Sequence, residues 1–405
     1  MGGVSGHMSH PWEIPELSFG DLKSMLVEIA SGSIQAYEKV DGINMHFTVD
    51  ANGHARFARN GTDIKNGGIS FQQLESLYQN HPAKITIVEG CRFIAESLQN
   101  VWWPLGFSRK NWVNCDIVLA ERPQLIKYDD NVVILHNASS FDTTGKQFAS
   151  DLSEQFTRLV NEMSQVGGTL GTGWKCSGPI LVEMPIVTGS GMLNEALDSI
   201  SMVQVAAGLN DDSRVFEYVK SALGATTLKG IREDLLDLTV ANLCELAGCK
   251  QLSEIKKLCS AAEYARISSL CKKEFKFRAL SEIYRPLETT FMRFGSKYLE
   301  HTHSGLITDH AAEKSRLVDL YETTIIKSAS EGIYDPVAKQ KFDSFVSRIN
   351  SIGLEISPIE GLVYEWRGNT IKLTGTFSLL NRAVGMSRFA KPVNETVMPL
   401  PFIRG

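Results

Sequence analysis

The hydrophobic pattern near the N-terminus predicts one amphipathic helix. After Ser18, a residue type that caps helices, apolar side chains recur at helical spacing until the chain reaches Ser31 and Gly32. We therefore expect a helix that begins near Leu17 and ends near residue 30. The segment before it, residues 1–10, has the composition of a cloning remnant, and we leave it outside the predicted fold.

The next segments alternate between strand-like and helical patterns. Short apolar runs predict strands, and Asp50 to Gly53 has the composition of a tight hairpin turn between two of them. The expected strands cover residues 35–40, 44–49, 54–58, 112–119, 132–136 and 180–183. The expected helices cover residues 70–79 and 84–101. Since this order lacks regular β-α-β spacing, the pattern favours an α+β domain.

The pattern changes between about residues 189 and 350, where apolar residues recur at helical spacing with almost no turn signals. Strand signals return at 361–365 and 370–374. Two strands alone make a marginal fold, so we expect the helices to be an insertion in the sheet domain. The predicted organisation is a core over 11–188, a helical domain over 189–350 and a second core segment over 351–405.

Composition and charge exclude several classes of protein. The chain has 405 residues, of which 43% are hydrophobic and 21% charged, as in a compact globular protein of two or three domains. The net charge of −5 means that any contact with nucleic acid must be local. Seven cysteines without a C-x-x-C pair argue against a disulfide framework and a zinc site. With no long apolar run, we expect a cytoplasmic monomer without a membrane span.

The strongest candidate for chemistry is the segment Glu38-Lys39-Val40-Asp41-Gly42, between an expected strand and a hairpin. A lysine that attacks phosphorus must be unprotonated, although a free lysine has a pKa of about 10.4. Burial or a nearby cation lowers such a pKa, whereas Asp41 alone would raise it. Asp41 is therefore an orienting group or a metal contact, and Gly42 lets the backbone approach a nucleotide. Because K-x-D-G also occurs by chance in surface turns, it needs further support.

Further motifs follow in a fixed order. Arg59 ends the third expected strand, where its planar guanidinium suits phosphate or ribose oxygens. Asp116 lies in the strand over 112–119, and Phe141 follows the strand over 132–136 as a ring able to stack on a base. Bland alternatives are a solvated arginine and a core phenylalanine.

Two more motifs lie near the C-terminus. Glu360 belongs to Ile-Glu-Gly-Leu-Val-Tyr, and Lys372 belongs to Ile-Lys-Leu-Thr on the next expected strand. A carboxylate can hold Mg²⁺, and a lysine can neutralise the α-phosphate while charge develops on its oxygens. The order of these motifs after K-x-D-G makes their joint occurrence by chance improbable.

Together these motifs resemble the covalent nucleotidyltransferase superfamily, which contains ATP-dependent RNA and DNA ligases and mRNA capping enzymes. The likeness extends to the ligase-like nucleotidyltransferases of large tailed phages, through K-V-D-G-x-N, F-A-R-N, K-N-G-G and I-E-G-x-V-Y. It implies a nucleotidyltransferase core of antiparallel sheets in which Lys39 carries AMP. If the chain is phage-encoded, it would act in the cytoplasm of a bacterial host.

The resemblance also implies roles for individual residues. Glu360 and Lys372 would act in catalysis with Lys39, and Glu360 and Asp41 would hold Mg²⁺ or Mn²⁺. Asp116 stands where the family usually has a glutamate that holds the ribose hydroxyl, so its shorter arm weakens that assignment. The implied nucleotide contacts are Glu38, Val40, Asp41, Gly42, Asn44, Arg59, Asp116, Phe141 and Lys372.

The implied activity is ATP-dependent joining of a 5′-phosphate to a 3′-hydroxyl in nucleic acid. Too few residues follow Lys372 for the C-terminal OB-fold of DNA ligases, so an RNA ligase is favoured over a DNA or hybrid ligase. A capping-type transferase and a non-catalytic nucleotide- or nucleic-acid-binding protein remain as alternatives. Candidates for contact with nucleic acid, each also explained by a turn or a solvated helix face, are Lys65, Lys272, Lys273, Lys276 and Arg278.

Overall fold

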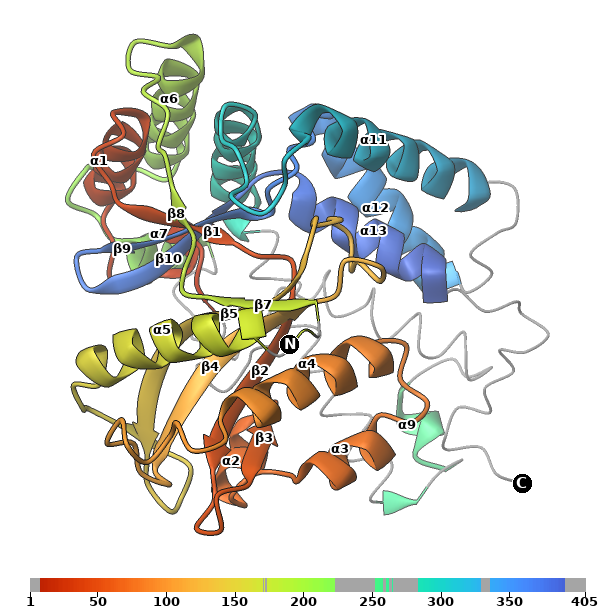
Figure 1. The fold of residues 1–405 in the computed structure, drawn as a ribbon. Coiled ribbons are helices and arrows are strands. Elements are labelled where there is room, and N and C mark those ends of the chain that lie inside the picture. The colour runs from red at the N-terminus through yellow and green to blue at the C-terminus, as the bar shows by residue number, and fades with distance from the viewer. Residues whose placement is uncertain are drawn as a thin grey trace.

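The protein is described by a computed structural model that covers residues 8–169, 171, 173–222, 252–257, 260–261, 264, 283–328 and 336–389. Over these residues the chain forms two β-sheets with helices packed around them (Figure 1). Nearly all strand pairs are antiparallel, and β5 with β7 is the parallel pair within the described strands. The α+β class expected from the sequence is thereby confirmed.

A four-stranded sheet contains segments from both ends of the chain. Its strand order is β10 (Asn369–Thr374), β9 (Gly361–Trp366), β1 (Ala36–Lys39) and β8 (Leu181–Val182). The six-stranded sheet follows the order β3 (Ala55–Ala58), β2 (Ile43–Val49), β4 (Asn111–Val118), β5 (Asn131–Phe141) and β6 (Gln147–Phe148), with β7 (Trp174–Ser177) also on β5. Since β1 and β2 follow each other but lie in different sheets, the chain crosses between the sheets just after Lys39.

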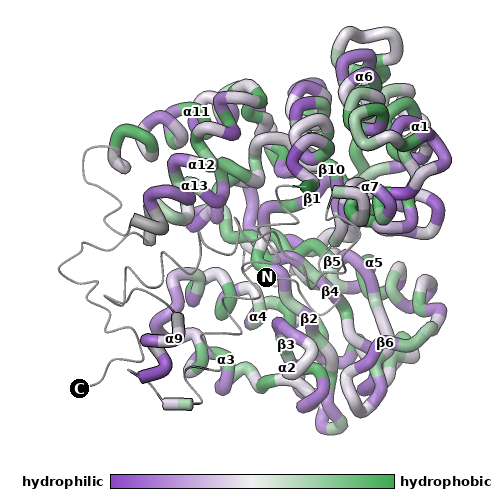
Figure 2. The backbone as a smooth tube through the Cα atoms, turned by 180° about the vertical axis from the view of Figure 1, so that it is seen from behind, coloured by the Kyte–Doolittle hydropathy of each residue, from purple (hydrophilic) through white to green (hydrophobic). Residues whose placement is uncertain are grey.

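The helices occur throughout the described residues. Those of the first half are η1 (Pro11–Glu13), α1 (Phe19–Ala30), α2 (Gly61–Lys65), α3 (Phe71–Leu77), α4 (Lys84–Ser97) and α5 (Ser153–Thr169). Those that follow are α6 (Gly191–Ala206), α7 (Val215–Ala222), α9 (Leu252–Ile255), a helical stretch over 283–299, α11 (His310–Lys327), α12 (Pro336–Ile352) and α13 (Phe377–Phe389). Along α11, α12 and α13 hydrophobic and hydrophilic stretches alternate, as expected of half-buried helices (Figure 2).

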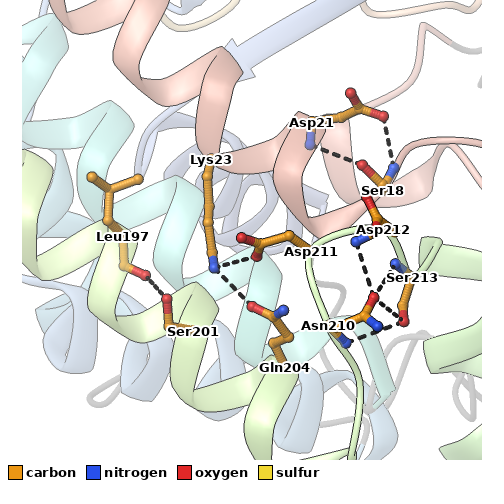
Figure 3. A network of polar contacts seen from close by, with 10 residues as sticks. All are labelled: Ser18, Asp21, Lys23, Leu197, Ser201, Gln204, Asn210, Asp211, Asp212 and Ser213. Carbon is orange, nitrogen blue, oxygen red and sulfur yellow. Dashed lines mark hydrogen bonds and ion pairs between the residues drawn. The ribbon is translucent and has the colours of Figure 1, made fainter.

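Helix α1 begins as the sequence indicates and is tied to α6. The Ser18 hydroxyl accepts a hydrogen bond from the Asp21 backbone N–H, and the Asp21 carboxylate accepts one from the Ser18 N–H. Lys23 donates to Gln204 at 2.7 Å and to Asp211 at 2.6 Å, which connects α1 with the end of α6 and the loop after it (Figure 3).

The described helices of the 189–350 segment pack against the four-stranded sheet. Leu193 of α6, Phe291 of the 283–299 helix and Leu317 of α11 share one hydrophobic core with Leu362 and Tyr364 of β9. Because these helices bury their apolar faces on the sheet, this part of the segment is continuous with the sheet domain. No helix in the described part of the chain has the length and apolar character to cross a membrane.

The N-terminal residues need a correction. Ser9 forms a parallel bridge with Ile371, and its carbonyl accepts a hydrogen bond from the Lys372 backbone N–H at 3.1 Å. The His10 ring stacks on Trp12 with centroids 4.3 Å apart. Residues 9 and 10 are therefore part of the fold, although their composition suggested a remnant. Helices α2 and α5 and strand β7 also lack a counterpart among the elements expected from sequence.

The two faces of the six-stranded sheet differ in polarity. One face, which includes Met45, Phe47, Cys115 and Leu135, is buried beneath the helices α4 and α5. Because side chains alternate along a strand, their neighbours in sequence face the other way. That opposite face carries polar side chains from three adjacent strands, and they are Asn44, His46, Asn114, Asp116 and His136. We call these five residues the polar face.

Candidate functional site

Lys39 lies at the end of β1, directly opposite Gly361 of β9. Its Nζ donates to Glu360 Oε1 at 2.6 Å, although 321 positions separate the two residues in the sequence. Their side chains are 26% and 13% exposed, so the ion pair is largely removed from solvent. A Cβ on Gly361 would lie 2.4 Å from the Leu373 carbonyl oxygen of β10. Only glycine therefore lets the three strands approach closely enough to form this pair.

Lys372 lies on the same side of the four-stranded sheet as Lys39. It pairs with Val363, which is two residues along β9 from the partner of Lys39, so the two lysines share a face. Burial lowers the pKa of Lys372 to about 8, against the attraction of Glu13, and the charge of Lys39 adds to the lowering. Glu13 belongs to the N-terminal segment, and sequence reasoning did not connect it with this site.

The electrostatics of Lys39 differ from the expectation for a nucleophile. Burial lowers its pKa, but the ion pair with Glu360 and the charges of Asp116 and Asp41 outweigh burial, so the pKa lies above its ordinary value. In turn, burial raises the pKa of Glu360 to about 7, against the opposing effect of Lys39. Without nucleotide, Lys39 is thus an ammonium next to a carboxylate that accepts protons near neutral pH.

Asp41 is turned toward a neighbouring loop. Its Oδ2 accepts hydrogen bonds from the N–H groups of Leu125 at 2.7 Å and Ile126 at 2.9 Å, and its own N–H donates to the Tyr128 hydroxyl. The residue is only 5% exposed, and burial raises its pKa although the two N–H groups oppose this. The geometry makes Asp41 an anchor that holds the chain just after Lys39 against residues 125–128.

Gly42, Asn44 and Asp116 meet where β2 runs beside β4. Asn44 donates to Asp116 Oδ1 at 3.2 Å and to Asn114 Oδ1 at 2.7 Å. A Cβ on Gly42 would lie 2.8 Å from the Asp116 Cβ, and the φ of Gly42 is not positive. The glycine is therefore needed for the close approach of Asp116, whereas the sequence had suggested approach to a nucleotide.

Two histidines of the polar face were not predicted from sequence. His136 of β5 contacts Asp116 Oδ2 through Nε2 at 2.9 Å. His46 of β2 is 2% exposed, and burial, together with the charge of His136, lowers its pKa to about 4, although Asp116 opposes this. Nothing in the sequence near either histidine marks it, because their proximity depends on the pairing of β2, β4 and β5.

The expected nucleotide contacts of Glu38 and Val40 need correction. Residues next to Lys39 on a strand point to the opposite face, and both side chains are buried, with 3% and 2% exposed. Glu38 accepts hydrogen bonds from the Ser304 hydroxyl at 2.7 Å and the Gly305 N–H at 3.0 Å, while Val40 belongs to the hydrophobic core. Their side chains hold β1 in place and do not reach a nucleotide on Lys39.

Arg59 and Phe141 are also placed differently from expectation. Arg59 lies beside the Tyr78 hydroxyl and Cys91, which belong to the layer of α3 and α4. Phe141 is buried in a small cluster with Ala58, Ile64 and Trp112. Asp116 pairs with Ile134, seven residues before Phe141 on β5, which is about 20 Å along a strand. Neither side chain can contact a nucleotide that is bound at Lys39 and Asp116.

The candidates for nucleic-acid contact fall into two groups. Lys65 is exposed at the end of α2, and Gly67 and Gly68 after it have φ of 77° and 80°, which explains why glycines form this turn. Lys65 therefore remains an accessible candidate. The other four lie outside the described residues, and they are Lys272, Lys273, Lys276 and Arg278.

The carboxylates near Lys39 were tested for their fit to Mg²⁺. Among the described residues no group of three or more histidine, cysteine, aspartate or glutamate side chains has the geometry of a metal site. Mg²⁺ commonly takes one or two carboxylates together with substrate phosphates and water, so a single carboxylate is compatible with it. Glu360 fits this requirement. Asp41 fits less well, because both backbone N–H groups already occupy one of its oxygens.

A cavity of about 1140 Å³ lies elsewhere, between β3 and the helices α3 and α4, and Arg92 and Trp103 are among its lining residues. None of the residues around Lys39 lines it. The chain matches no protein-family model, and no curated protein matches it significantly in sequence. The functional argument therefore depends on the site itself.

Proposed function

We propose that the protein is an ATP-dependent polynucleotide ligase of the RNA-ligase type that carries AMP on Lys39. The observation that supports this proposal is the meeting of Lys39, Glu360 and Lys372, which lie on three adjacent strands from opposite ends of the chain. A buried lysine is a known type of covalent nucleophile, and a second lysine and a carboxylate beside it suit phosphoryl transfer. The proposal includes DNA or hybrid ends as alternative substrates.

The first step forms a bond between Lys39 and AMP. The lone pair of Nζ attacks the α-phosphorus of ATP, a P–N bond forms, and the bond to the bridging oxygen breaks so that pyrophosphate leaves. Nζ must lose a proton, and Glu360 Oε1 lies 2.6 Å away. With a pKa raised by burial to about 7, Glu360 is a competent acceptor for that proton near neutral pH.

Lys372 stabilises negative charge in this step. It shares a face with Lys39, so its ammonium lies on the side where the α-phosphate oxygens gain charge. Mg²⁺ held by Glu360 would neutralise further charge on the phosphate oxygens. Since the pKa of Lys372 is about 8, the residue keeps its proton at neutral pH and loses it in mildly alkaline solution.

The two later steps transfer AMP and join the ends. An oxygen of the 5′-phosphate attacks the phosphorus of lysyl-AMP, the P–N bond breaks, and Lys39 is regenerated. The 3′-hydroxyl then attacks the activated 5′-phosphate, a phosphodiester forms, and AMP leaves with the electron pair of the broken P–O bond. The accessible Lys65 is the described candidate for contact with the polynucleotide.

A non-catalytic nucleotide-binding protein is the second candidate. The observation that favours it is the ion pair of Lys39 with Glu360, which raises the pKa of Lys39 and so opposes its action as a nucleophile. A binder would hold ATP at this site without forming a covalent adduct. The same experiment separates the two candidates.

The test is incubation with α-labelled ATP and Mg²⁺, followed by a denaturing gel. We expect label on the wild-type protein and none on Lys39→Ala, since that variant lacks the nucleophile. Lys339→Ala is the matched control, because Lys339 is an exposed lysine on α12 and should leave labelling intact. Label on the Lys39→Ala protein would move the nucleophile elsewhere, and ATP binding without any adduct would favour the second candidate.

A further inference from the structure

His136 lies at a β-bulge. On β4 and β5, Asn114 pairs with Asn137, whereas the next residue, Cys115, pairs with Leu135. His136 is therefore the extra residue of β5, with no residue directly opposite it. Bulges disturb the regular alternation of side chains and often redirect one of them beside a functional site. Here the bulge places the imidazole diagonally next to Asp116, on the polar face.

The contacts of Asp116 determine which group on this face is available to a ligand. Asn44 donates to Oδ1 at 3.2 Å, and His136 Nε2 lies 2.9 Å from Oδ2, so both carboxylate oxygens are engaged. Despite burial, the charge and hydrogen bond of His136 lower the pKa of Asp116, which is therefore ionised. An ionised carboxylate accepts, so Nε2 carries the proton and Nδ1 is an acceptor in the neutral ring.

His136 also has room for a ligand. Its side chain is 26% exposed, and within the described part of the chain no group is hydrogen-bonded to Nδ1. Asp116 lies close enough to Lys39 to influence its pKa, so the imidazole is one residue removed from the nucleophile's surroundings. In a lysyl-AMP the ribose follows directly after the phosphate, and its hydroxyl groups extend away from Nζ along this face.

We propose that His136 is the residue that selects a ribose-bearing nucleotide, by accepting a hydrogen bond from a ribose hydroxyl at Nδ1. This inference rests on the proposed function, because it places the ribose of ATP beside Lys39. Asp116 is then a positioning residue that fixes the ring and its tautomer. The imidazole supplies the reach that the short aspartate side chain lacks, and its acceptor satisfies the hydroxyl that a deoxynucleotide does not have.

The test compares ATP with 2′-deoxy-ATP and 3′-deoxy-ATP in formation of the lysyl adduct. We expect the wild-type protein to prefer ATP over at least one deoxynucleotide. His136→Ala should slow the reaction with ATP by about threefold to tenfold, as for loss of one hydrogen bond, and leave that deoxynucleotide unaffected. His136→Gln, which keeps an acceptor, should restore part of the preference. His54→Ala changes an exposed histidine on the β2–β3 hairpin and is the matched control.

A second readout does not depend on the chemical step. Calorimetric affinities for ATP and the two deoxynucleotides, measured on Lys39→Ala protein with and without His136→Ala, should show the same loss of preference. Equal losses with all three nucleotides would overturn the inference, since His136 would then act only through the framework of the site. An unchanged preference would also overturn it. If wild-type protein forms no adduct with ATP, the proposed function fails first, and this inference fails with it.

Discussion

The buried carboxylate next to the nucleophile gives a pH-dependent contribution to stability that can be isolated. Glu38 accepts hydrogen bonds from the Ser304 hydroxyl and the Gly305 N–H, yet burial raises its pKa from 4.5 to about 7 against these two contacts. Glu38→Gln keeps the size of the side chain and one acceptor oxygen but cannot ionise. The variant should therefore be more stable than the wild-type protein where Glu38 is charged.

The size and sign follow from proton linkage. Between pH 4.5 and about 7 the folded state binds more protons at Glu38 than the unfolded state, so its contribution is present below pH 4.5 and is lost as pH rises through about 7. Each unit of pKa difference corresponds to about 1.4 kcal/mol, which gives about 3 kcal/mol over this window. The free energy of unfolding of Glu38→Gln, relative to wild type, should rise by about that amount between pH 4.5 and pH 8.

The assay is urea unfolding of both proteins at several pH values in this window. Glu360 and His46 also titrate here, with pKa values of about 7 and about 4, but their contributions cancel when the variant is compared with wild type at each pH. Glu154→Gln alters an exposed glutamate on α5 and should give a difference that does not vary with pH. If the difference for Glu38→Gln is equally constant, the reasoning from burial is refuted.

Three further predictions concern the proposed reaction. Glu360→Ala and Lys372→Ala should fold but form lysyl-AMP about 10²–10³ times more slowly, as measured by single-turnover labelling; rates near wild type would make the two motifs coincidental. Gly42→Ala should lose about 1–3 kcal/mol in thermal unfolding, because its Cβ would lie 2.8 Å from that of Asp116, and unchanged stability would contradict the close approach. Labelling should be intact, while sealing and the salt dependence of RNA binding weaken by about 0.7–0.9 in log-log slope per lost contact, when alanine replaces Lys272, Lys273, Lys276 and Arg278; sealing like that of the parent would leave only a solvated helix face.

The sequence by itself determined the local elements and the strands that carry the proposed chemistry. The turn over 50–53 and the strands on either side of it follow from short-range pattern, and the hairpin between β2 and β3 confirms them. The two C-terminal strands were also predicted as neighbours, and β9 pairs with β10 in the structure. These features depend on residues that are close in sequence, so periodicity and turn composition are sufficient to find them.

Only the tertiary structure decided which side chains meet and in which protonation state. Arg59 and Phe141 have suitable chemistry, but the strand pairing puts one beside α3 and α4 and the other in a separate core cluster. His136 enters the site through a bulge, and a one-residue shift in pairing is not encoded by any local motif. The pKa of Lys39 is raised because Glu360 arrives from 321 residues away. Side-chain direction and electrostatic potential both depend on contacts between distant segments, which a linear pattern of residues does not specify.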